Sequence, residues 1–347
     1  MIKARGMAIS SKNAPFTLIN FDRRELLDHD VQIEIHFCGI CHSDIHQAQN
    51  DWKRAQYPMI PGHEITGIVT SVGKNVRKFK LGDPVGVGCM IDSCLQCSSC
   101  KNHEEQFCIE GATYTYNSPS RDGTEVTKGG YSNTIVVREE FVLKIPDALD
   151  LKHAAPLLCA GITLFSPLTH WKVQKNSQIA IIGLGGLGHM GLKIAHAMGA
   201  QVTIISHNEQ KKNDAYSMNA VRFINSKQEN FHIPYQQSFD LIINTTSIDC
   251  DFSIYLSMLK VNGTLVSVGL PEKPVIINPI ALIAGRKSFA GSLIGGVKET
   301  QECLDFCAKN QVTPMIEMIT PYEIDEAYAK IINSKARYRI VMDLRNF

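Results

Sequence analysis

Four cysteines crowd one short stretch of the chain, CLQCSSCKNHEEQFC. Two, two and seven residues separate them, at Cys94, Cys97, Cys100 and Cys108. Zinc takes four tetrahedral ligands, and C-x2-C spacings let one loop wrap around the ion. Four thiolates complete the coordination sphere and leave no position for a substrate, so such a site is structural. The stretch therefore predicts a structural zinc lobe over residues 89–110.

Three other interpretations of these cysteines were weighed. Bacterial iron–sulfur runs also begin C-x2-C-x2-C, but their fourth cysteine follows after three residues and precedes proline; Cys108 follows after seven and precedes Ile109. Four unrelated thiols remain the simplest alternative. Disulfides are disfavoured because the first residues, MIKARGMAISSKNAPF, contain no apolar secretory core. We therefore expect a cytoplasmic protein whose eleven cysteines are mostly reduced.

A glycine-rich turn, IAIIGLGGLGHMG, offers a second chemistry. Gly183, Gly185 and Gly188 follow G-x-G-x-x-G order, with an apolar strand-like run before them and a helical pattern after them. In that context the motif indicates dinucleotide binding, because the glycines allow close backbone approach and the helix N-terminus receives a pyrophosphate. The alternative is a glycine-rich turn with a purely structural role.

The next strand, QVTIIS, bears on which dinucleotide is bound. NAD enzymes usually carry Asp or Glu near its end, to bind the ribose 2′-hydroxyl. Here the strand ends at Ser206, with no carboxylate at its end; His207, Asn208, Glu209, Lys211 and Lys212 follow. A carboxylate would repel a 2′-phosphate, whereas serine and lysine bind one, so the sequence predicts NADP. A solvated helix face would equally explain the lysines, so Ser206 carries most of this argument.

Length and composition indicate the number of domains and the class of protein that carry these motifs. A chain of 347 residues is longer than one core usually grows, which predicts two domains. With 44% hydrophobic and 20% charged residues and a net charge of +1, the chain reads as soluble and globular. The balanced charge argues against a nucleic-acid or membrane surface, which favours small-molecule substrates.

The elements that would position the motifs change along the chain. Residues 1–150 contain many short β-like runs broken by Gly, Pro and Asp, which predict a barrel-like β domain. From Ser177 strands alternate with helical segments, as in a parallel sheet of βαβ units. Near the end, apolar residues at helical spacing over 324–332 predict an amphipathic helix, and YRIVMDL a strand. We expect this tail to fold back onto the first domain.

Together these motifs resemble a known family. The stretches CGICHSDIHQAQNDW, YPMIPGHEITGIVTSVG, PLLCAGIT, GSLIGG and RYRIVMD are similar to those of zinc-dependent medium-chain alcohol dehydrogenases, in the cinnamyl alcohol dehydrogenase-like branch. The resemblance covers essentially the whole chain. It implies an α/β and β fold: a GroES-like β-barrel catalytic domain (1–156 and 296–347) and a doubly wound, parallel-sheet Rossmann NADP-binding domain (157–295). It also implies a homodimer.

The resemblance further implies a catalytic zinc, the second zinc of each chain. Its ligands by motif match are Cys41, His63 and Cys159, with Glu64 close enough to approach the ion, and Asp44 would orient His63. Two thiolates, one imidazole and an open position form the zinc pattern of alcohol dehydrogenases. Cys159 rests on the resemblance alone, because nothing in its spacing distinguishes it from the other cysteines.

The implied reaction passes a hydride between nicotinamide and an alcohol or aldehyde whose oxygen is bound by zinc acting as a Lewis acid. Ser43 matches the family's relay hydroxyl, and His46 and Asp51 match the next positions of the proton path. Arg339, in the terminal strand, is expected to pair with Glu64. The remaining implied residues contact the cofactor: Thr163, Gly183, Leu184, Gly185, Gly186, Leu187, Gly188, Ser206, His207, Asn208, Lys211, Thr245, Gly269, Ser292, Leu293 and Ile294.

Two departures from the plant enzymes bear on substrate. Tyr114 stands where they usually carry Trp, and Leu293 where they often carry Phe, which weakens an aromatic sandwich for a phenylpropanoid ring. We therefore expect a reductase of broad range, accepting aromatic and aliphatic aldehydes. The alternatives are an NAD-linked zinc polyol or alcohol dehydrogenase, a non-enzymatic zinc-binding module, and a quinone reductase-like relative without zinc. Zinc content separates the last two from the dehydrogenases.

Overall fold

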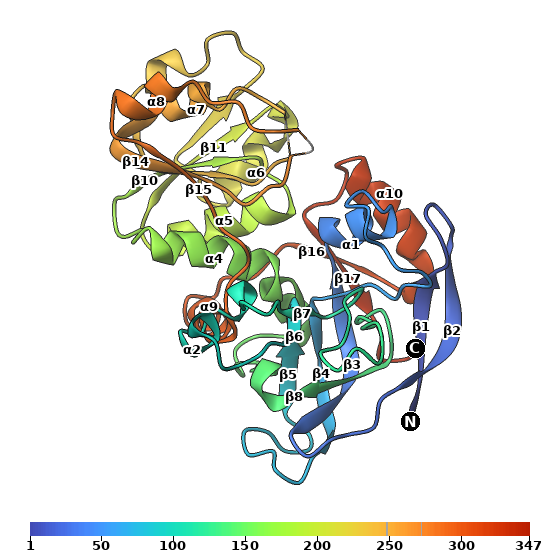
Figure 1. Ribbon diagram of the computed structural model, residues 1–347. Helices are drawn as coiled ribbons and strands as arrows, with labels where there is room; N and C mark the ends of the chain where they lie inside the picture. Colours follow the sequence, from blue (N-terminus) through green and yellow to red (C-terminus); the bar gives the residue numbers. More distant parts are fainter. Residues whose placement is uncertain (248, 272) are drawn as a thin grey trace. The chain divides into compact units, whose positions relative to one another are not determined.

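The computed structural model describes residues 1–247, 249–271 and 273–347 (Figure 1). Two compact units divide the chain. The first unit joins Met1–Ile162 with Gly295–Phe347, and the second is Thr163–Ile294. The sequence-based boundaries were 156/157 and 295/296.

The first unit is organised around a seven-stranded sheet. Its order is β16-β17-β3-β4-β5-β9, with β8 paired to β3. The strands are β3 (Asp30–Ile40), β4 (Ile65–Val72), β5 (Pro84–Val87), β8 (Thr134–Arg138), β9 (Leu143–Lys144), β16 (Ile316–Ile319) and β17 (Arg339–Asp343). Val31, Ile33 and Ile35 alternate along β3 and are fully buried, so one face of this strand forms the core. This explains the short β-like runs of the first 150 residues.

The tail returns to this sheet as the sequence predicted. Strand β17 pairs antiparallel with β3, with Ile340 opposite Ile40, and α10 (Ile324–Ile332) precedes it. The helix buries Ile324, Ala327 and Tyr328, which are part of the apolar periodicity that predicted it. Both predicted elements are therefore confirmed, and the last strand ends up beside one of the first.

Smaller elements complete the first unit. Strands β1 (Ile2–Ile9) and β2 (Phe16–Arg23) form a hairpin, and β6 (Met90–Asp92) pairs with β7 (Thr113–Tyr114) on either side of the four-cysteine stretch. The helices are α1 (His42–Ala48), α2 (Ser98–Lys101), α3 (Leu151–Ala154), α9 (Val297–Lys309) and α10, and the 3-10 turns include η1 (Glu105–Phe107), η2 (Glu139–Phe141), η3 (Ala155–Leu158) and η6 (Pro321–Glu323).

The second unit is a six-stranded parallel sheet with the order β12-β11-β10-β13-β14-β15. Its strands are β10 (Gln178–Ile182), β11 (Gln201–Ser206), β12 (Arg222–Asn225), β13 (Phe239–Asn244), β14 (Leu259–Ser267) and β15 (Ser288–Gly291). The chain winds outward from β10 in one direction and then from β13 in the other, so the strand order reverses between these two strands. Such a reversal marks the place where doubly wound folds bind their ligands.

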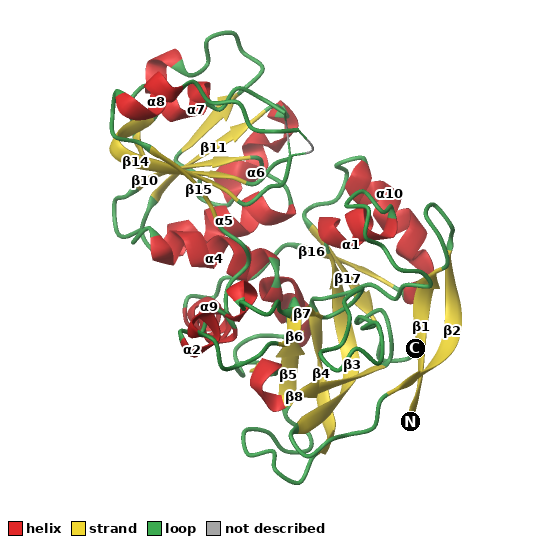
Figure 2. Cartoon of the chain, viewed as in Figure 1, coloured by secondary structure: helices red, strands yellow, loops and turns green. Residues whose placement is uncertain are grey.

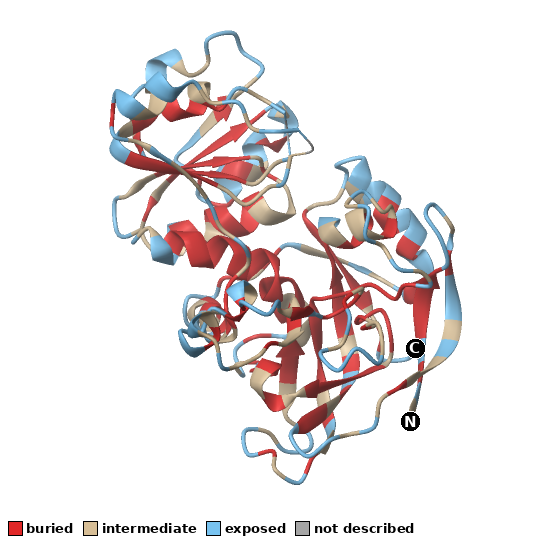
Figure 3. Ribbon diagram, in the orientation of Figure 1, coloured by how far each residue is buried: buried red, intermediate tan, exposed pale blue. Residues whose placement is uncertain are grey.

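Helices cover both faces of this sheet (Figure 2). They are α4 (Ala160–His170, which begins in the first unit), α5 (Gly186–Ala197), α6 (Lys212–Ser217), α7 (Ser253–Ser257) and α8 (Pro279–Ile283), and η4 (Glu209–Lys211) and η5 (Ile233–Tyr235) are 3-10 turns. The central strands are buried, as Figure 3 shows for each sheet. Near-continuous burial of QIAII and QVTIIS is expected of parallel strands covered on two sides.

Taken singly, the helices of the described residues differ in length and hydropathy from a membrane span. No single helix there is long and apolar enough to cross a bilayer; one bent pair, Leu151–Leu158 with Ala160–His170, meets the criterion by length and composition only.

Candidate metal centres and cofactor loop

The first candidate centre is a buried cluster of four side chains. Cys41, His63, Glu64 and Cys159 each offer a ligand atom, and these atoms all lie within 4.8 Å of one another. The two sulfur atoms are 3.8 Å apart. Thiolate, imidazole and carboxylate are the donors that zinc takes in proteins, so the chemistry of this set fits the predicted metal.

Sheet topology brings three of these residues together. Cys41 directly follows β3 and caps α1, while His63 and Glu64 directly precede β4. Strands β3 and β4 are antiparallel neighbours, with Cys38 opposite Ile65, so the end of one meets the start of the other. Cys159 arrives from a different place, between η3 and α4. The structure thus unites the residues that only the family resemblance had grouped.

Asp44 holds the His63 ring. Its Oδ1 lies 2.9 Å from His63 Nδ1, and its Oδ2 accepts a 2.9 Å hydrogen bond from the backbone N–H of Cys41. Because Nδ1 is engaged in this way, Nε2 is the ring nitrogen left for a metal. Burial by itself lowers the pKa of His63. Asp44 and neighbouring groups raise it by a larger amount, so the pKa of His63 lies well above its usual value. The predicted contact between Asp44 and His63 is present.

A buried ion pair stands beside the thiols. Arg339 on β17 pairs with Oε1 of Glu64, and both side chains are buried, so this predicted contact is also present. Burial raises the pKa of Glu64 to about 7, although Arg339 opposes the shift. Glu64 Oε2 is buried and lacks a hydrogen-bond partner among the described residues. A buried polar atom without a partner calls for an explanation, and a cation in the cluster would supply one.

The pKa values of the two thiols in this cluster are shifted in opposite directions. The pKa of Cys41 is well below its usual value, chiefly because Cys159 donates a hydrogen bond to it. The pKa of Cys159 is well above its usual value, because hydrogen bonding with Cys41 and Cys89, together with burial, favours its protonated form. One thiolate is therefore favoured in this cluster, which helps it to accept a cation.

The three predicted relay residues lie on and just after α1. Ser43 is half-buried on that helix, next to Asp44. His46 Nδ1 lies 2.8 Å from Asp51 Oδ2, and both side chains are about one-third exposed. The structure therefore pairs the last two residues at a solvent-accessible position, while the role of all three in proton transfer stays a prediction.

The second candidate centre is the four-cysteine lobe. The sulfur atoms of Cys94, Cys97, Cys100 and Cys108 lie within 4.8 Å of one another, and all eleven cysteines are free of disulfides. Backbone N–H groups support the sulfurs, with Cys97 N donating to Cys94 Sγ at 3.3 Å and Cys94 N to Cys108 Sγ at 3.5 Å. Hydrogen bonds from backbone N–H groups at Cys100 and Ile109 lower the pKa of Cys97 to about 6. The thiolate of Cys97 is thereby favoured, whereas burial raises the pKa of Cys100 to about 12.

The four-cysteine lobe contacts the N-terminus of helix α9. The buried Glu105 of η1 accepts a 3.0 Å hydrogen bond at Oε2 from the backbone N–H of Val297, the first residue of α9. A carboxylate at a helix N-terminus satisfies an otherwise unpaired N–H and complements the helix dipole. A Cβ at Gly296 would lie 1.7 Å from the carbonyl oxygen of His103, so only glycine permits this approach.

The glycine turn has the geometry that its motif predicted. Gly183 has a φ of +93°, and a Cβ on Gly188 would lie 2.0 Å from the Gly183 carbonyl oxygen. Both positions therefore require glycine. Gly185 is the N-cap of α5, so the unpaired N–H groups of the first turn are available to a pyrophosphate.

Other predicted cofactor residues follow the same edge of the sheet. Gly183 follows β10, Ser206 ends β11, and Thr245, Gly269 and Ser292 come after β13, β14 and β15. Because these strands are parallel, their carboxyl ends lie at one edge, where open α/β sheets bind ligands. The Thr245 hydroxyl donates to the Ile182 carbonyl at 2.8 Å, which ties the two central strands at the point where the strand order reverses.

Ser206 and Lys211 take distinct places at that edge. Ser206 is buried and its Oγ accepts from the backbone N–H of Asn208 at 3.2 Å. Lys211 is also buried, and its Nζ donates to the Leu184 carbonyl at 2.7 Å. The cation therefore braces the glycine turn. The other predicted cofactor residues lie at the turn itself (Gly186 and Leu187 on α5), on α4 (Thr163), after β11 (His207) and after β15 (Leu293 and Ile294).

Sequence reasoning missed three tyrosines around the first centre. The Tyr116 ring stacks on His63 at 5.9 Å between centroids, and Tyr131 donates from its hydroxyl to Asp44 Oδ2 at 3.1 Å. Tyr328 approaches Tyr131 from α10. No metal-ligand or catalytic spacing includes them. The one available signal was the glycine pair directly before Tyr131, which indicates a tight backbone approach.

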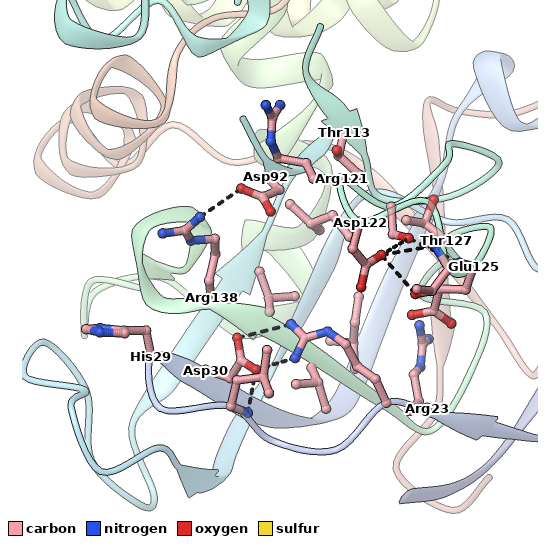
Figure 4. A pocket seen from close by; sticks show the side chains of 18 of the residues that line it. Arg23, His29, Asp30, Asp92, Thr113, Arg121, Asp122, Glu125, Thr127 and Arg138 are labelled. Atoms are coloured by element: carbon pink, nitrogen blue, oxygen red, sulfur yellow. Dashed lines mark hydrogen bonds and ion pairs between the residues drawn. The ribbon is translucent and has the colours of Figure 1, made fainter. Parts of the chain in front are cut away.

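A surface pocket of about 670 Å³ lies elsewhere in the first unit (Figure 4). Its charged side chains pair with one another or with neighbours: Arg24 with Asp30, and Arg138 with Asp92. The described residues that line it include no cysteine. These mutual pairs leave the pocket without a clear preference for a charged ligand.

Comparison with known proteins agrees with this geometry. A family model of the alcohol dehydrogenase GroES-like domain matches residues 27–147, and one of zinc-binding dehydrogenases matches residues 186–309. NADP-dependent alcohol dehydrogenase C of Mycobacterium bovis is 50% identical over 337 residues, which cover 97% of each protein. The chain belongs to the zinc-binding alcohol dehydrogenase family.

Solved structures show the same kinship over the full length. A cinnamyl alcohol dehydrogenase from Sorghum bicolor has a TM-score of 0.96 and 38% identity, covering 99% of this chain and 98% of that one. A cinnamyl alcohol dehydrogenase from Helicobacter pylori, complexed with NADP(H), has a TM-score of 0.93 and 44% identity, covering 99% of both. The predicted family, the two-domain fold class and the alcohol dehydrogenase activity are therefore confirmed.

Proposed function

We propose that this alcohol dehydrogenase is a zinc-dependent, NADP(H)-linked enzyme that acts mainly as an aldehyde reductase on aromatic and aliphatic aldehydes. The observation that carries the proposal is the buried donor set of Cys41, His63 and Cys159 with Glu64 beside it. An NAD-linked zinc alcohol or polyol dehydrogenase is the alternative.

These four residues would hold a zinc ion in the first centre. When bound, zinc supplies Lewis-acid polarisation of the substrate oxygen, and the nicotinamide supplies or accepts the hydride. The chain's own residues manage the proton and the geometry. Asp44 fixes the His63 ring, and the His46–Asp51 pair, at 2.8 Å, lies near enough to solvent to exchange a proton with it. Ser43 is the hydroxyl proposed to link substrate to this pair.

A second zinc is proposed for the four-cysteine lobe, giving two ions per chain. Cys94, Cys97, Cys100 and Cys108 supply four thiols within 4.8 Å, which would complete a tetrahedral site. Its contribution would be to stability, since no ligand position is left for a substrate.

The proposed preference for NADP(H) rests on Ser206, together with the relatives that use NADP. Ser206 ends β11 where NAD enzymes usually place a carboxylate. Its hydroxyl does not repel a 2′-phosphate. The buried ammonium of Lys211 adds positive charge nearby, while it holds the Leu184 carbonyl.

The proposed breadth of substrate rests on two partly exposed side chains. Tyr114 and Leu293 replace the larger aromatic residues of the plant enzymes and leave fewer ring surfaces for a phenylpropanoid. We therefore propose that benzaldehyde, cinnamaldehyde and short aliphatic aldehydes are all reduced.

The test is steady-state oxidation of NADPH and of NADH by zinc-replete protein with that panel of aldehydes. We expect NADPH to be strongly preferred. In Ser206→Asp the ratio of kcat/KM values should shift toward NADH by about a hundredfold, because like charges brought together cost several kcal/mol. The matched variant Ser288→Asp, at the exposed amino end of β15, should leave the ratio unchanged. Wild-type preference for NADH would refute the assignment of Ser206, and turnover of polyols alone would favour the alternative.

A homodimer and a cytoplasmic location complete the proposal. The second unit exposes Ile276, Ile280 and Ile283 around α8, an apolar surface suited to a second copy of the chain. Light scattering should report a monomer for Ile283→Lys and a dimer for Ile109→Lys, an equally exposed residue of the first unit. A cytoplasmic location is supported by the six thiols of the two clusters, which bind metal only when reduced.

A further inference from the structure

The carboxylate of Asp44 is held by four donors. Oδ1 is approached by His63 Nδ1 at 2.9 Å and the Gly62 N–H at 3.3 Å, and Oδ2 by the Cys41 N–H at 2.9 Å and the Tyr131 hydroxyl at 3.1 Å. The first three donors belong to the two segments that carry Cys41 and His63. Of these four donors, Tyr131 is the one from a segment without a metal ligand, and it is fully buried. The buried Tyr116 also hydrogen-bonds with Asp44 and stacks on His63.

Backbone hydrogen bonds join the segment that carries Tyr131 (residues 129–131) to the segment just before His63 (residues 60–62). Gly129, Gly130 and Tyr131 donate to the carbonyls of Ile60, Gly62 and Pro61 at 2.7, 2.9 and 3.0 Å. A Cβ on Gly129 would lie 2.2 Å from the Pro61 carbonyl oxygen, and one on Gly62 would lie 2.7 Å from the Tyr131 ring. Glycine at these positions is what lets the two segments lie so close, and the phenol is thereby aimed at Asp44.

Arg23 on β2 anchors the far side of the same segment. Its Nε donates to the Thr134 carbonyl at 2.9 Å, and its Nη2 donates to the Gly129 carbonyl and the Ser132 hydroxyl, each at 2.9 Å. The guanidinium is nine-tenths buried, and burial lowers the pKa of Arg23 to about 9. Arg23 also lines the surface pocket of Figure 4. A buried cation whose donors are used on one loop restrains that loop strongly.

The Asp44 carboxylate can only accept, so it fixes the direction of its hydrogen bond with Tyr131, and Tyr328 lies on the other side of the Tyr131 hydroxyl. The Tyr328 hydroxyl lies 3.5 Å from the Tyr131 hydroxyl and donates to it, so the Tyr131 proton is left for Asp44. Burial, reinforced by Asp44, raises the pKa of Tyr131 well above its usual value, so the phenol stays neutral and remains a donor. A tyrosine that only filled space would not require this alignment of its hydroxyl.

We propose that Tyr131 is a positioning residue for the buried metal centre: its hydroxyl fixes Oδ2 of Asp44, so that Oδ1 holds the His63 ring in its ligating orientation. Without that contact the carboxylate is held less firmly at Oδ2, and the ring loses part of its restraint. Partners of this kind, one step beyond the ligands, commonly change metal affinity or activity by about 10- to 100-fold. The inference rests on the proposed function, because it assumes zinc at Cys41, His63 and Cys159.

The test compares zinc release from wild-type protein and from Tyr131→Phe, which removes a single hydroxyl. Both are loaded with two zinc ions and challenged with a chromogenic chelator. We expect one ion to leave Tyr131→Phe about tenfold faster, and the other ion at the wild-type rate. The visible spectrum of cobalt(II) in the buried site should also change, whereas KM for NADPH should not. Tyr255→Phe, a buried tyrosine of the second unit, should behave as wild type in both assays.

Unchanged zinc release and an unchanged cobalt spectrum in Tyr131→Phe would overturn the inference, even if the melting temperature fell. If that variant does not fold, Ser132→Ala replaces it, because it loosens the same loop at its contact with Arg23; wild-type release from Ser132→Ala would then overturn the inference. A wild-type chain with the same zinc content as Cys159→Ser would have no zinc at the buried centre, which would overturn the proposed function and this inference together; the two failures are therefore distinguishable.

Discussion

The four-cysteine lobe draws every donor from residues 94–108, whereas the buried cluster draws its donors from three segments and is steadied by a fourth, β17. The lobe uses backbone N–H groups of its own loop to favour thiolates. The buried cluster uses distant side chains, Asp44 and Arg339. One short loop thus brings the donors of the lobe together, whereas the donors of the buried cluster depend on the surrounding fold.

The largest expected effect comes from removing a ligand of the buried cluster. Cys159→Ser should lose one zinc ion and about a thousandfold in kcat/KM, because a Lewis acid contributes several kcal/mol and each 1.4 kcal/mol is tenfold in rate. Metal analysis and NADPH oxidation measure both quantities. Cys250→Ser, a cysteine of neither cluster, is the matched control. Retention of two ions with normal turnover would refute the catalytic assignment.

The same substitution in the lobe should separate stability from catalysis. Cys97→Ser should also lose one zinc ion, yet its main effect should be a melting temperature lower by roughly 10 °C, since a structural metal contributes directly to folding. The kcat of the protein that stays folded should remain near the wild-type value. A fall in kcat at an unchanged melting temperature would contradict this division of roles.

A smaller effect is expected from the ion pair that steadies the buried cluster. Arg339→Ala leaves the Glu64 carboxylate buried without its partner. We expect zinc to leave the buried site about 10 to 100 times faster, as measured with a chelator. Arg345→Ala, an exposed arginine just beyond β17, serves as the control. A fully active Arg339→Ala variant that retains both ions would refute the claim that Arg339 helps this cluster to hold zinc.

The smallest expected effect on stability comes from the contact between the lobe and the N-terminus of α9. Glu105→Ala removes the carboxylate that accepts from Val297 N, and the loss of such a cap costs about 1 kcal/mol. Differential scanning calorimetry should show a melting temperature lower by about 2 to 4 °C. Glu104→Ala, at the exposed neighbouring position, should not change it. An equal shift in both variants would mean that the contact with α9 contributes nothing measurable.

The contrast between the clusters also explains what the sequence could predict. The cysteine spacing and the glycine turn are local patterns whose chemistry follows from the chain alone. Cys41, His63 and Cys159 were assigned through the family resemblance, and the spacing of Cys159 gave no separate signal, because only tertiary structure brings it within 3.8 Å of Cys41. Tyr131 and Arg23 escaped notice because their roles depend on contacts with residues far away in the chain.

The position of Arg339 has a consequence for how the protein is made. Ribosomes add about 5 to 20 residues per second. The lobe is complete once Cys108 has emerged, whereas β17, which brings Arg339 to Glu64, is synthesised roughly 10 to 50 seconds later at that pace. The nascent chain therefore acquires a zinc-binding loop early and its buried centre last. Chains that stall before β17 would contain all four cysteines of the lobe but lack the arginine that pairs with Glu64.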